Sequence, residues 1–187
     1  MKSIYVILTR TNTILSRIIN IVTNDKFTHA SISLDKNLET MYSFGRRNVY
    51  NPFIGTFVIE NFNEGVYGFH EYLHGQVIEI EVTNEQYESV EKLTNNFILN
   101  NESYKYNYIG LINILLKRES FSENKFLCSE FVYYILNSSN IIDLKIPRNL
   151  VRPQYFEKLN GKVIYEGNLK DIYINSDYLK FLQTMPT

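Results

Sequence analysis

The stretch KFLCSEFVYYIL, residues 125–136, contains Cys128, the only cysteine among 187 residues. Read as a helix, it places Phe131, Val132 and Ile135 three, four and seven positions after Cys128. The thiol then lies on the apolar, inward-facing stripe of that helix. A free cysteine there is most simply a small buried hydrophobic group. The same position also suits a nucleophile on the floor of a cleft, so residues elsewhere must separate the two interpretations.

Position along this helix favours reactivity. Ser122 or Asn124 is the expected N-cap, which puts Cys128 within about the first turn. Backbone N–H groups of a first turn lack intrahelical acceptors and the helix dipole stabilises an anion there, so both favour a thiolate. Glu130 lies in the same turn. We interpret its carboxylate as a structural group that interacts favourably with the helix dipole and bonds to a neighbouring loop. A catalytic role is not expected, because a negative charge beside the nucleophile opposes thiolate formation.

His29 is the candidate partner of the thiol, because a nucleophilic cysteine needs a base. The predicted strand FTHASISL, residues 27–34, places His29, Ser31 and Ser33 on one face and apolar residues on the other. A histidine followed by small polar residues on one face indicates an open, polar site. The alternative is a structural histidine at the edge of a strand, whose hydrogen bonds are made within the fold.

A β-hairpin is expected here, because the strand-like LETMYSF, residues 38–44, follows a turn at residues 35–37. A three-residue turn pairs Leu34 with Leu38 and places Ser43 opposite His29. A hydroxyl at that place could orient the imidazole through its other nitrogen. A two-residue turn would instead bring Phe44 opposite His29.

Other polar residues near this hairpin are weaker candidates. Tyr42 and Glu39 are alternative orienting groups for the imidazole. Tyr5, on the first predicted strand, and Ser31 join Tyr42 and Glu130 as residues that support the site or line the substrate wall.

The stretch HEYLH, residues 70–74, matches the H-E-x-x-H zinc motif. On a helix, His70 and His74 would share one face and bind the metal, with Glu71 as the base. Glycines at both ends leave room for less than two helical turns, and a strand follows at once. A zinc protein is therefore the less favoured alternative to a surface turn with two solvated histidines, and we expect no cofactor.

The remaining sequence predicts one α+β domain over residues 1–187. Strands are expected at 3–10, 76–82 and 161–168, and helices at 11–24, 83–100, 106–118 and 122–140. The helix at 83–100 begins with a capping-box pattern at Thr83. Residues 45–75 contain five of the eight glycines and predict a long irregular segment, typical of a lid or a binding wall.

Composition narrows the partners. The net charge is -1 and no Lys/Arg block is present, so nothing indicates nucleic acid or an anionic membrane. The apolar runs are too interrupted for a signal peptide or a membrane span, and we expect a cytoplasmic protein without stable membrane insertion. One cysteine cannot form an internal disulfide. The oligomeric state is not indicated.

The stretch THASISLD, followed about a hundred residues later by FLCSEFVYYIL, resembles the permuted papain-fold proteins. This group contains the YaeF/YiiX-type amidases and is related to the NlpC-type cell-wall hydrolases. In the permuted group the histidine precedes the cysteine, as His29 precedes Cys128 here. The stretch MYSFGRRNVYNPFIGTFVIE is similar to a block of uncharacterised bacterial members. The matching blocks run from about residue 3 to about 155.

The resemblance implies a circularly permuted papain-like fold, in which an antiparallel sheet packs against the cysteine helix. It also implies Cys128 as nucleophile, His29 as base and a third polar residue on the strand after the histidine. Here that strand offers only Met41, Tyr42 and Ser43. We therefore expect a thiol hydrolase or acyltransferase that cleaves an amide or ester bond of a small-molecule, peptide or lipid-acyl substrate. A catalytically weak or inactive binding or regulatory module of the same fold is the alternative.

Overall fold

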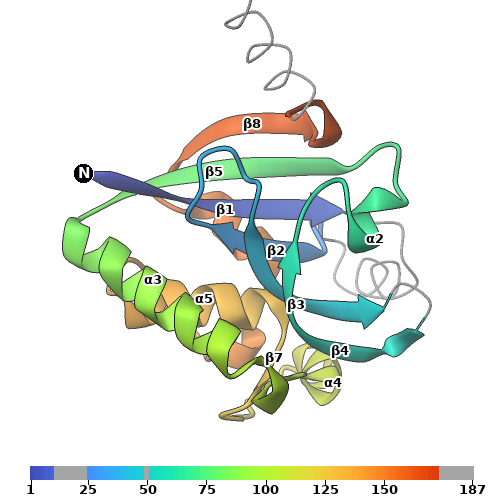
Figure 1. The fold of residues 1–187 in the computed structure, drawn as a ribbon. Coiled ribbons are helices and arrows are strands. Elements are labelled where there is room, and N and C mark those ends of the chain that lie inside the picture. Colours follow the sequence, from blue (N-terminus) through green and yellow to red (C-terminus); the bar gives the residue numbers. More distant parts are fainter. Residues whose placement is uncertain (11–24, 49–50, 173–187) are drawn as a thin grey trace, which may run out of the picture.

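The computed structural model describes residues 1–10, 25–48 and 51–172, with their side chains outside 47–54. A six-stranded antiparallel sheet in the order β4-β3-β2-β1-β5-β8 forms its centre (Figure 1). The strands are β1 (Lys2–Arg10), β2 (His29–Ser33), β3 (Met41–Asn48), β4 (Asn51–Glu60), β5 (His74–Val82) and β8 (Lys162–Asn168). The helix predicted at 11–24 lies outside the described residues.

Two helices cover one face of this sheet, α3 (Asn84–Leu99) and α5 (Cys128–Ser138) (Figure 1). A short parallel pair, β6 (Lys105–Tyr106) and β7 (Lys125–Phe126), flanks α4 (Tyr108–Leu115) in the chain. The remaining elements are α2 (Gly65–Gly68), η1 (Asn101–Ser103), η2 (Arg148–Leu150) and η3 (Pro153–Lys158). The predicted α+β class is confirmed.

The central strand β1 is buried on both faces. Ile4, Val6 and Leu8 pack in the larger core between the sheet and the helices α3 and α5. Tyr5 and Ile7 point to the other face, where they join a smaller apolar cluster that includes Tyr67 of α2. A strand covered on both faces reads as a nearly continuous apolar run, which explains the stretch SIYVILTR.

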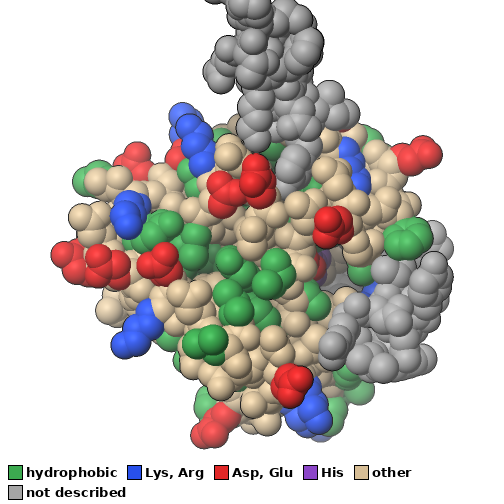
Figure 2. Space-filling view, viewed as in Figure 1, with side chains coloured by type: hydrophobic (Ala, Val, Ile, Leu, Met, Phe, Trp, Pro, Cys, Tyr) green, Lys and Arg blue, Asp and Glu red, His purple; other side chains and the backbone are tan. Residues whose placement is uncertain are grey.

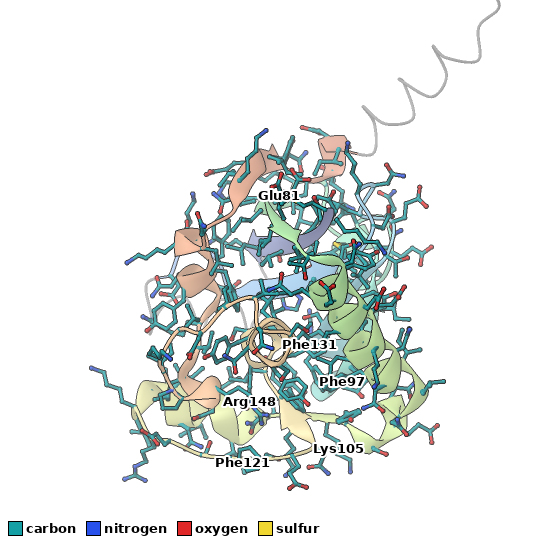
Figure 3. All side chains as sticks on the ribbon, turned by 90° about the vertical axis from the view of Figure 1, so that its left-hand side faces the viewer. Glu81, Phe97, Lys105, Phe121, Phe131 and Arg148 are labelled. Atoms are coloured by element: carbon teal, nitrogen blue, oxygen red, sulfur yellow. The ribbon has the colours of Figure 1, made fainter. Side chains whose placement is uncertain are left out.

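Aromatic packing sets the position of α5. The ring of Phe131 lies 5.0 Å from that of Phe97 on α3, 5.5 Å from Phe44 on β3 and 5.6 Å from Phe57 on β4. Figure 3 shows Phe131 and Phe97 in the layer between the helices and the sheet. Aromatic rings at such distances add specific attraction to the burial of their area. The helix that begins with Cys128 is thus fixed against the two strands of the β3–β4 hairpin.

The long irregular segment predicted at 45–75 is present only between β4 and β5. Residues 45–48 and 51–60 belong to the strands β3 and β4, in which Phe44 pairs with Phe57. The glycines suggested a loop, but Gly55 lies in a strand that passes close to Tyr106. A Cβ built on Gly55 would lie 2.5 Å from the Tyr106 Cβ. Only the part after β4 is irregular, and it contains the four-residue helix α2.

The predicted helices over 83–100 and 106–118 are confirmed as α3 and α4. Thr83 accepts from the backbone N–H of Gln86, whose side chain returns a bond to the Thr83 N–H, so the capping box is formed. The predicted N-cap of α5 is wrong. Lys125 and Phe126 pair with β6, so the helix begins only after Leu127.

Acidic, basic and hydrophobic side chains are interspersed on the face of the molecule shown in Figure 2. Within the described ranges, no helix has both the length and the apolar character needed to cross a bilayer.

Candidate active site

Cys128 is the first residue of α5, one position after the N-cap. Its side chain is buried, and so are Phe131, Val132 and Ile135, which confirms the predicted inward-facing stripe. The first N–H groups of a helix have no intrahelical acceptor. The thiol therefore lies closer to the positive end of the helix dipole than the sequence suggested.

Buried polar contacts hold this helix start in place. Glu130 Oε2 accepts from the Leu127 N–H at 3.1 Å, and Glu130 Oε1 accepts from Arg148 Nε at 3.0 Å. The Ser129 hydroxyl donates to the Val151 carbonyl at 2.6 Å. Glu130 is only 1% exposed. These bonds place Glu130 in the supporting position that we expected from its place in the first turn.

His29 begins β2, and its ring is held by a carboxylate. Its Nε2 lies 3.0 Å from Oε1 and 3.1 Å from Oε2 of Glu60, the last residue of β4. The carboxylate accepts, so Nε2–H donates and Nδ1 is the nitrogen left for another partner. Cys128 lies close enough to the His29 ring to raise its pKa, so the thiol is the candidate for that partner.

The charges of this group favour a protonated imidazole. Burial lowers the pKa of His29, but Glu60 and Cys128, through their charges and hydrogen bonds, raise it well above the ordinary value of 6.5. The side chains of His29 and Glu60 are 16% and 15% exposed, so solvent screens their attraction only in part. The Glu60 carboxylate therefore favours the charged form of the His29 ring.

Glu60 is itself positioned by Tyr67 of α2. The Tyr67 hydroxyl lies 3.4 Å from Glu60 Oε2 and 3.2 Å from the hydroxyl of Thr9. Burial and the Glu60 carboxylate raise the pKa of Tyr67 well above its usual value of 10.0, so the phenol keeps its proton. The Tyr67 ring also meets the His29 ring edge-on, with 6.2 Å between centroids.

The hairpin register explains why Ser43 is not the orienting residue. Ile32 pairs with Tyr42, which shifts the predicted register by two residues and brings Gly45 to the position opposite His29. A Cβ built on Gly45 would lie 3.5 Å from Glu60 Oε1 and 3.8 Å from His29 Cε1. The carboxylate thus reaches the imidazole over a residue without a side chain. Ser43 is fully buried and donates instead to the Ala30 carbonyl at 2.7 Å.

The cause of the shifted register is a longer turn. Asp35 accepts from the N–H groups of Asn37 at 2.9 Å and Glu39 at 3.0 Å, and Ser33 donates to the Thr40 carbonyl at 2.7 Å. Leu38 has a φ of 58° and is 2% exposed in the smaller core. The loop therefore turns Leu38 inward, whereas we predicted that it pairs with Leu34. The hairpin itself is confirmed, but its predicted turn and register are wrong.

Three further candidates lie away from the pair. Tyr42 is on the opposite face of β3 from Ser43 and stacks on Phe57 at 6.2 Å. The hydroxyl of Tyr5 donates to Glu79 on β5 at 3.3 Å. Ser31 is fully buried against Met41, where we had expected an open polar face.

The zinc alternative needs a helix that is not formed. His70 follows α2 in a turn, while His74 is the first residue of β5 and stacks on Phe27. The two imidazoles therefore do not share a helical face. In the ranges that the structure describes, no three His, Cys, Asp or Glu side chains form a group suited to a metal ion.

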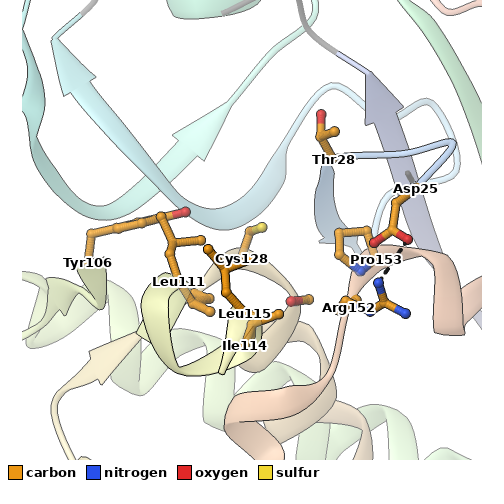
Figure 4. A pocket seen from close by; sticks show the side chains of 11 residues that line it. Asp25, Thr28, Tyr106, Leu111, Ile114, Leu115, Cys128, Arg152 and Pro153 are labelled. Carbon is orange, nitrogen blue, oxygen red and sulfur yellow. Dashed lines mark hydrogen bonds and ion pairs between the residues drawn. The ribbon is translucent and has the colours of Figure 1, made fainter. Parts of the chain in front are cut away.

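A small cavity lies beside Cys128. It is lined on one side by Tyr106 and the inner residues of α4, and on the other by Thr28 and the Arg152–Asp25 ion pair (Figure 4). Burial and then the charge of Cys128 raise the pKa of Tyr106 well above its usual value of 10.0. Its hydroxyl therefore keeps its proton beside the thiol.

Sequence reasoning missed Glu60, Tyr67 and Tyr106. The strand-like TFVIE before Asn61 indicates that Glu60 ends a strand, but nothing local indicates which residue its carboxylate meets. Nothing local points to Tyr67 or Tyr106, since the chain contains 15 tyrosines. No family model matches the chain, and no curated protein sequence is significantly similar to it.

Proposed function

We propose that this protein is a thiol hydrolase or acyltransferase that cleaves an amide or ester bond, with Cys128 as nucleophile and His29 as base. The observation that supports it most directly is the bond of Glu60 to His29, together with the proximity of Cys128 to the same ring, which raises its pKa. A nucleophile, a base and a third group that orients the base are the parts that such chemistry requires.

The reaction begins with a thiolate–imidazolium pair. The Cys128 thiolate attacks the carbonyl carbon, and a C–S bond forms as the carbonyl π electrons move onto oxygen. Collapse of the tetrahedral intermediate breaks the bond to the leaving amine or alcohol, which takes the proton from His29. Water, or an acceptor hydroxyl or amine, then gives a proton to His29 and attacks the thioester, which releases the acyl group and restores the thiolate.

Two donors are available for the oxyanion. The backbone N–H of Cys128 is among the unpaired groups at the start of α5. Tyr106 lines the same cavity, and its hydroxyl stays protonated. Donors fixed before the reaction at the place where negative charge develops are usually a large part of catalysis.

The fold that we propose is a circularly permuted papain-like one. It is supported by the order of the two reacting residues and by the antiparallel sheet packed on the helix that begins with Cys128. The third residue comes from β4, the strand after the one on which we expected it. The non-catalytic alternative depended on a weak orienting group, and no observation now favours it because Glu60 supplies a carboxylate.

Alkylation tests the proposal directly. Folded wild-type protein should incorporate one equivalent of iodoacetamide at Cys128 at pH 6, where an unpaired thiol reacts slowly. His29→Asn should slow this labelling, while His70→Asn, at a partly exposed histidine after α2, should not. Mass spectrometry of the intact protein and of its peptides gives the site. If Cys128 reacts at pH 6 no faster than in the urea-unfolded chain, the proposal is wrong.

A further inference from the structure

The cavity beside Cys128 has a volume of about 50 Å³. Most of its wall is apolar and comes from β6, α4, the N-cap of α5 and the start of η3. These residues are Tyr106, Leu111, Ile114, Leu115, Leu127 and Pro153. Figure 4 shows that α4 and η3 stand on opposite sides of the cysteine.

Most of the exposed wall is apolar, and two of its polar contacts lie within the protein. Arg152 donates to Asp25 at 3.1 Å, and both belong to a salt bridge in which Asp25 is 1% exposed. Ser129 donates to the Val151 carbonyl. An occupant therefore meets a surface that gains from burying carbon rather than from binding a charge.

Size limits what this occupant can be. At roughly 10–15 Å³ for each water-sized group, a cavity of about 50 Å³ takes about three to five non-hydrogen atoms. Cys128 is part of the wall, so an occupant of this cavity lies beside the carbonyl carbon that the thiolate attacks. A bulky sugar or a charged side chain does not fit this description.

We propose that this cavity binds the carbon chain of the acyl group, and that the preferred substrates have a short aliphatic chain of about four to six carbons on the acyl side. This inference rests on the proposed function, because it takes Cys128 as the atom that becomes acylated. The chain could belong to a fatty acid or to an apolar amino-acid residue. Both present the same aliphatic group to the wall.

The helix α4 provides the specificity. Leu111 and Ile114 line the cavity, and Leu115 lines it while remaining 43% exposed. Ile112, on the same helix, is 55% exposed and does not line it. Ile114→Ala and Ile112→Ala therefore form a matched pair of variants, because each removes an apolar side chain from the same short helix and only the first changes the cavity wall.

Alkyl methanethiosulfonates of different chain length test the size preference of the cavity, and their reaction with Cys128 does not require turnover of a substrate. The Cys128 thiolate attacks the sulfenyl sulfur, an S–S bond forms, and methanesulfinate leaves with the electron pair of the broken S–S bond. The alkyl group then extends directly from the cysteine. Rates for methyl, propyl, pentyl and octyl reagents are measured on the full chain and divided by those of the same reagents with glutathione.

The normalised rate should rise about three- to fourfold for each added methylene up to the pentyl reagent and stop rising at octyl. Ile114→Ala should move the preference towards octyl, and Leu111→Trp should abolish the preference while methyl labelling persists. Ile112→Ala should behave as wild type. Nitrophenyl esters of acetic, hexanoic and N-acetylnorleucine acids, followed as acyl-Cys128 by mass spectrometry, separate the fatty-acyl from the amino-acid source.

Flat normalised rates, with normal iodoacetamide labelling of Cys128, would overturn the acyl-cavity proposal and leave the proposed function intact. A preference that Ile114→Ala and Ile112→Ala alter equally would also overturn it. A Cys128 that is inert to both iodoacetamide and methyl methanethiosulfonate removes the proposed function, and this inference with it.

Discussion

Glu60 Oε1 lies 3.0 Å from Nε2 of His29, although the two residues are 31 positions apart in the chain. They come from strands that are not neighbours, since β3 lies between β2 and β4. The carboxylate crosses β3 above Gly45. This contact gives the imidazole its orientation and, together with Cys128, its raised pKa.

Glu60→Gln keeps the shape and removes the charge. Burial then acts on the His29 pKa with less opposition, and the pKa falls. A smaller fraction of the ring is protonated at pH 6, so the thiolate loses its counter-ion and iodoacetamide labelling slows. The expected loss is roughly tenfold for each unit by which the pKa falls below 6. The exposed Glu64→Gln is the control, and unchanged labelling of Glu60→Gln at pH 6 contradicts the assignment.

The same variant should show a pH-dependent loss of stability. The folded-state pKa of His29 lies above its unfolded value of about 6.5, so protonation of His29 stabilises the fold. This stabilisation is complete below that pH and is lost as the pH rises through the folded-state pKa. Urea unfolding should therefore show a larger cost of Glu60→Gln at pH 6 than at pH 9.5. An equal cost at both would mean that the pair is not coupled.

Ser43→Ala tests the residue that the hairpin alone suggested. Its hydroxyl bonds to the Ala30 carbonyl and not to His29. We expect a loss of about 1 kcal/mol in the free energy of unfolding and labelling of Cys128 within about twofold of wild type. A large loss of labelling at unchanged stability would mean that Ser43 orients His29 after all.

Local sequence patterns were sufficient to predict those elements whose structure depends mainly on their own residues. The β-branched run of β1, the alternation of β5 and the capping box at Thr83 all predicted what forms. So did the stripe behind Cys128. Glu60 could not be assigned, because its position depends on the length of the turn at residues 34–40 and on the pairing of β4. That length is determined by local bonds of the Asp35 side chain and by the burial of Leu38, and the burial of Leu38 is a tertiary effect.

Glu130→Ala should affect stability more than chemistry. It leaves Arg148, whose side chain is 18% exposed, without its carboxylate and leaves the Leu127 N–H without its acceptor. Breaking a buried pair in this way costs about 3 kcal/mol or more, measured by urea unfolding. The exposed Glu123→Ala, in the preceding loop, should change stability by less than about 0.5 kcal/mol. If Glu130→Ala is as stable as wild type but inactive, Glu130 has a chemical role that we have not assigned.

Tyr106→Phe separates oxyanion stabilisation from nucleophilicity. Iodoacetamide alkylation forms no oxyanion, so labelling should stay within about twofold of wild type. Turnover of an activated ester that acylates Cys128 should fall on the order of 100-fold in kcat. Tyr108→Phe, at a neighbouring residue whose ring packs 4.9 Å from that of Tyr106, is the control. Equal losses in labelling and turnover would assign Tyr106 to packing instead.

Gly45 tests whether the space between His29 and Glu60 is needed. An alanine Cβ would make ordinary contacts, at 3.4 Å from Val58 Cγ2 and 3.5 Å from Glu60 Oε1. Gly45→Ala should therefore label like wild type and change stability by less than about 1 kcal/mol. Gly45→Leu adds atoms where the carboxylate meets the imidazole, so labelling at pH 6 should be lost, with about 1–3 kcal/mol of destabilisation. The control Ile59→Leu, at a position on β4 that is 60% exposed, should leave both unchanged.

Because an overpacked protein can lose activity through general destabilisation, the informative measurement is the pH profile of Cys128 labelling in Gly45→Leu at a temperature where it is folded. A profile shifted to higher pH, as in Glu60→Gln, shows that the pair has been separated, whereas a wild-type profile shows that Glu60 reaches His29 by another path.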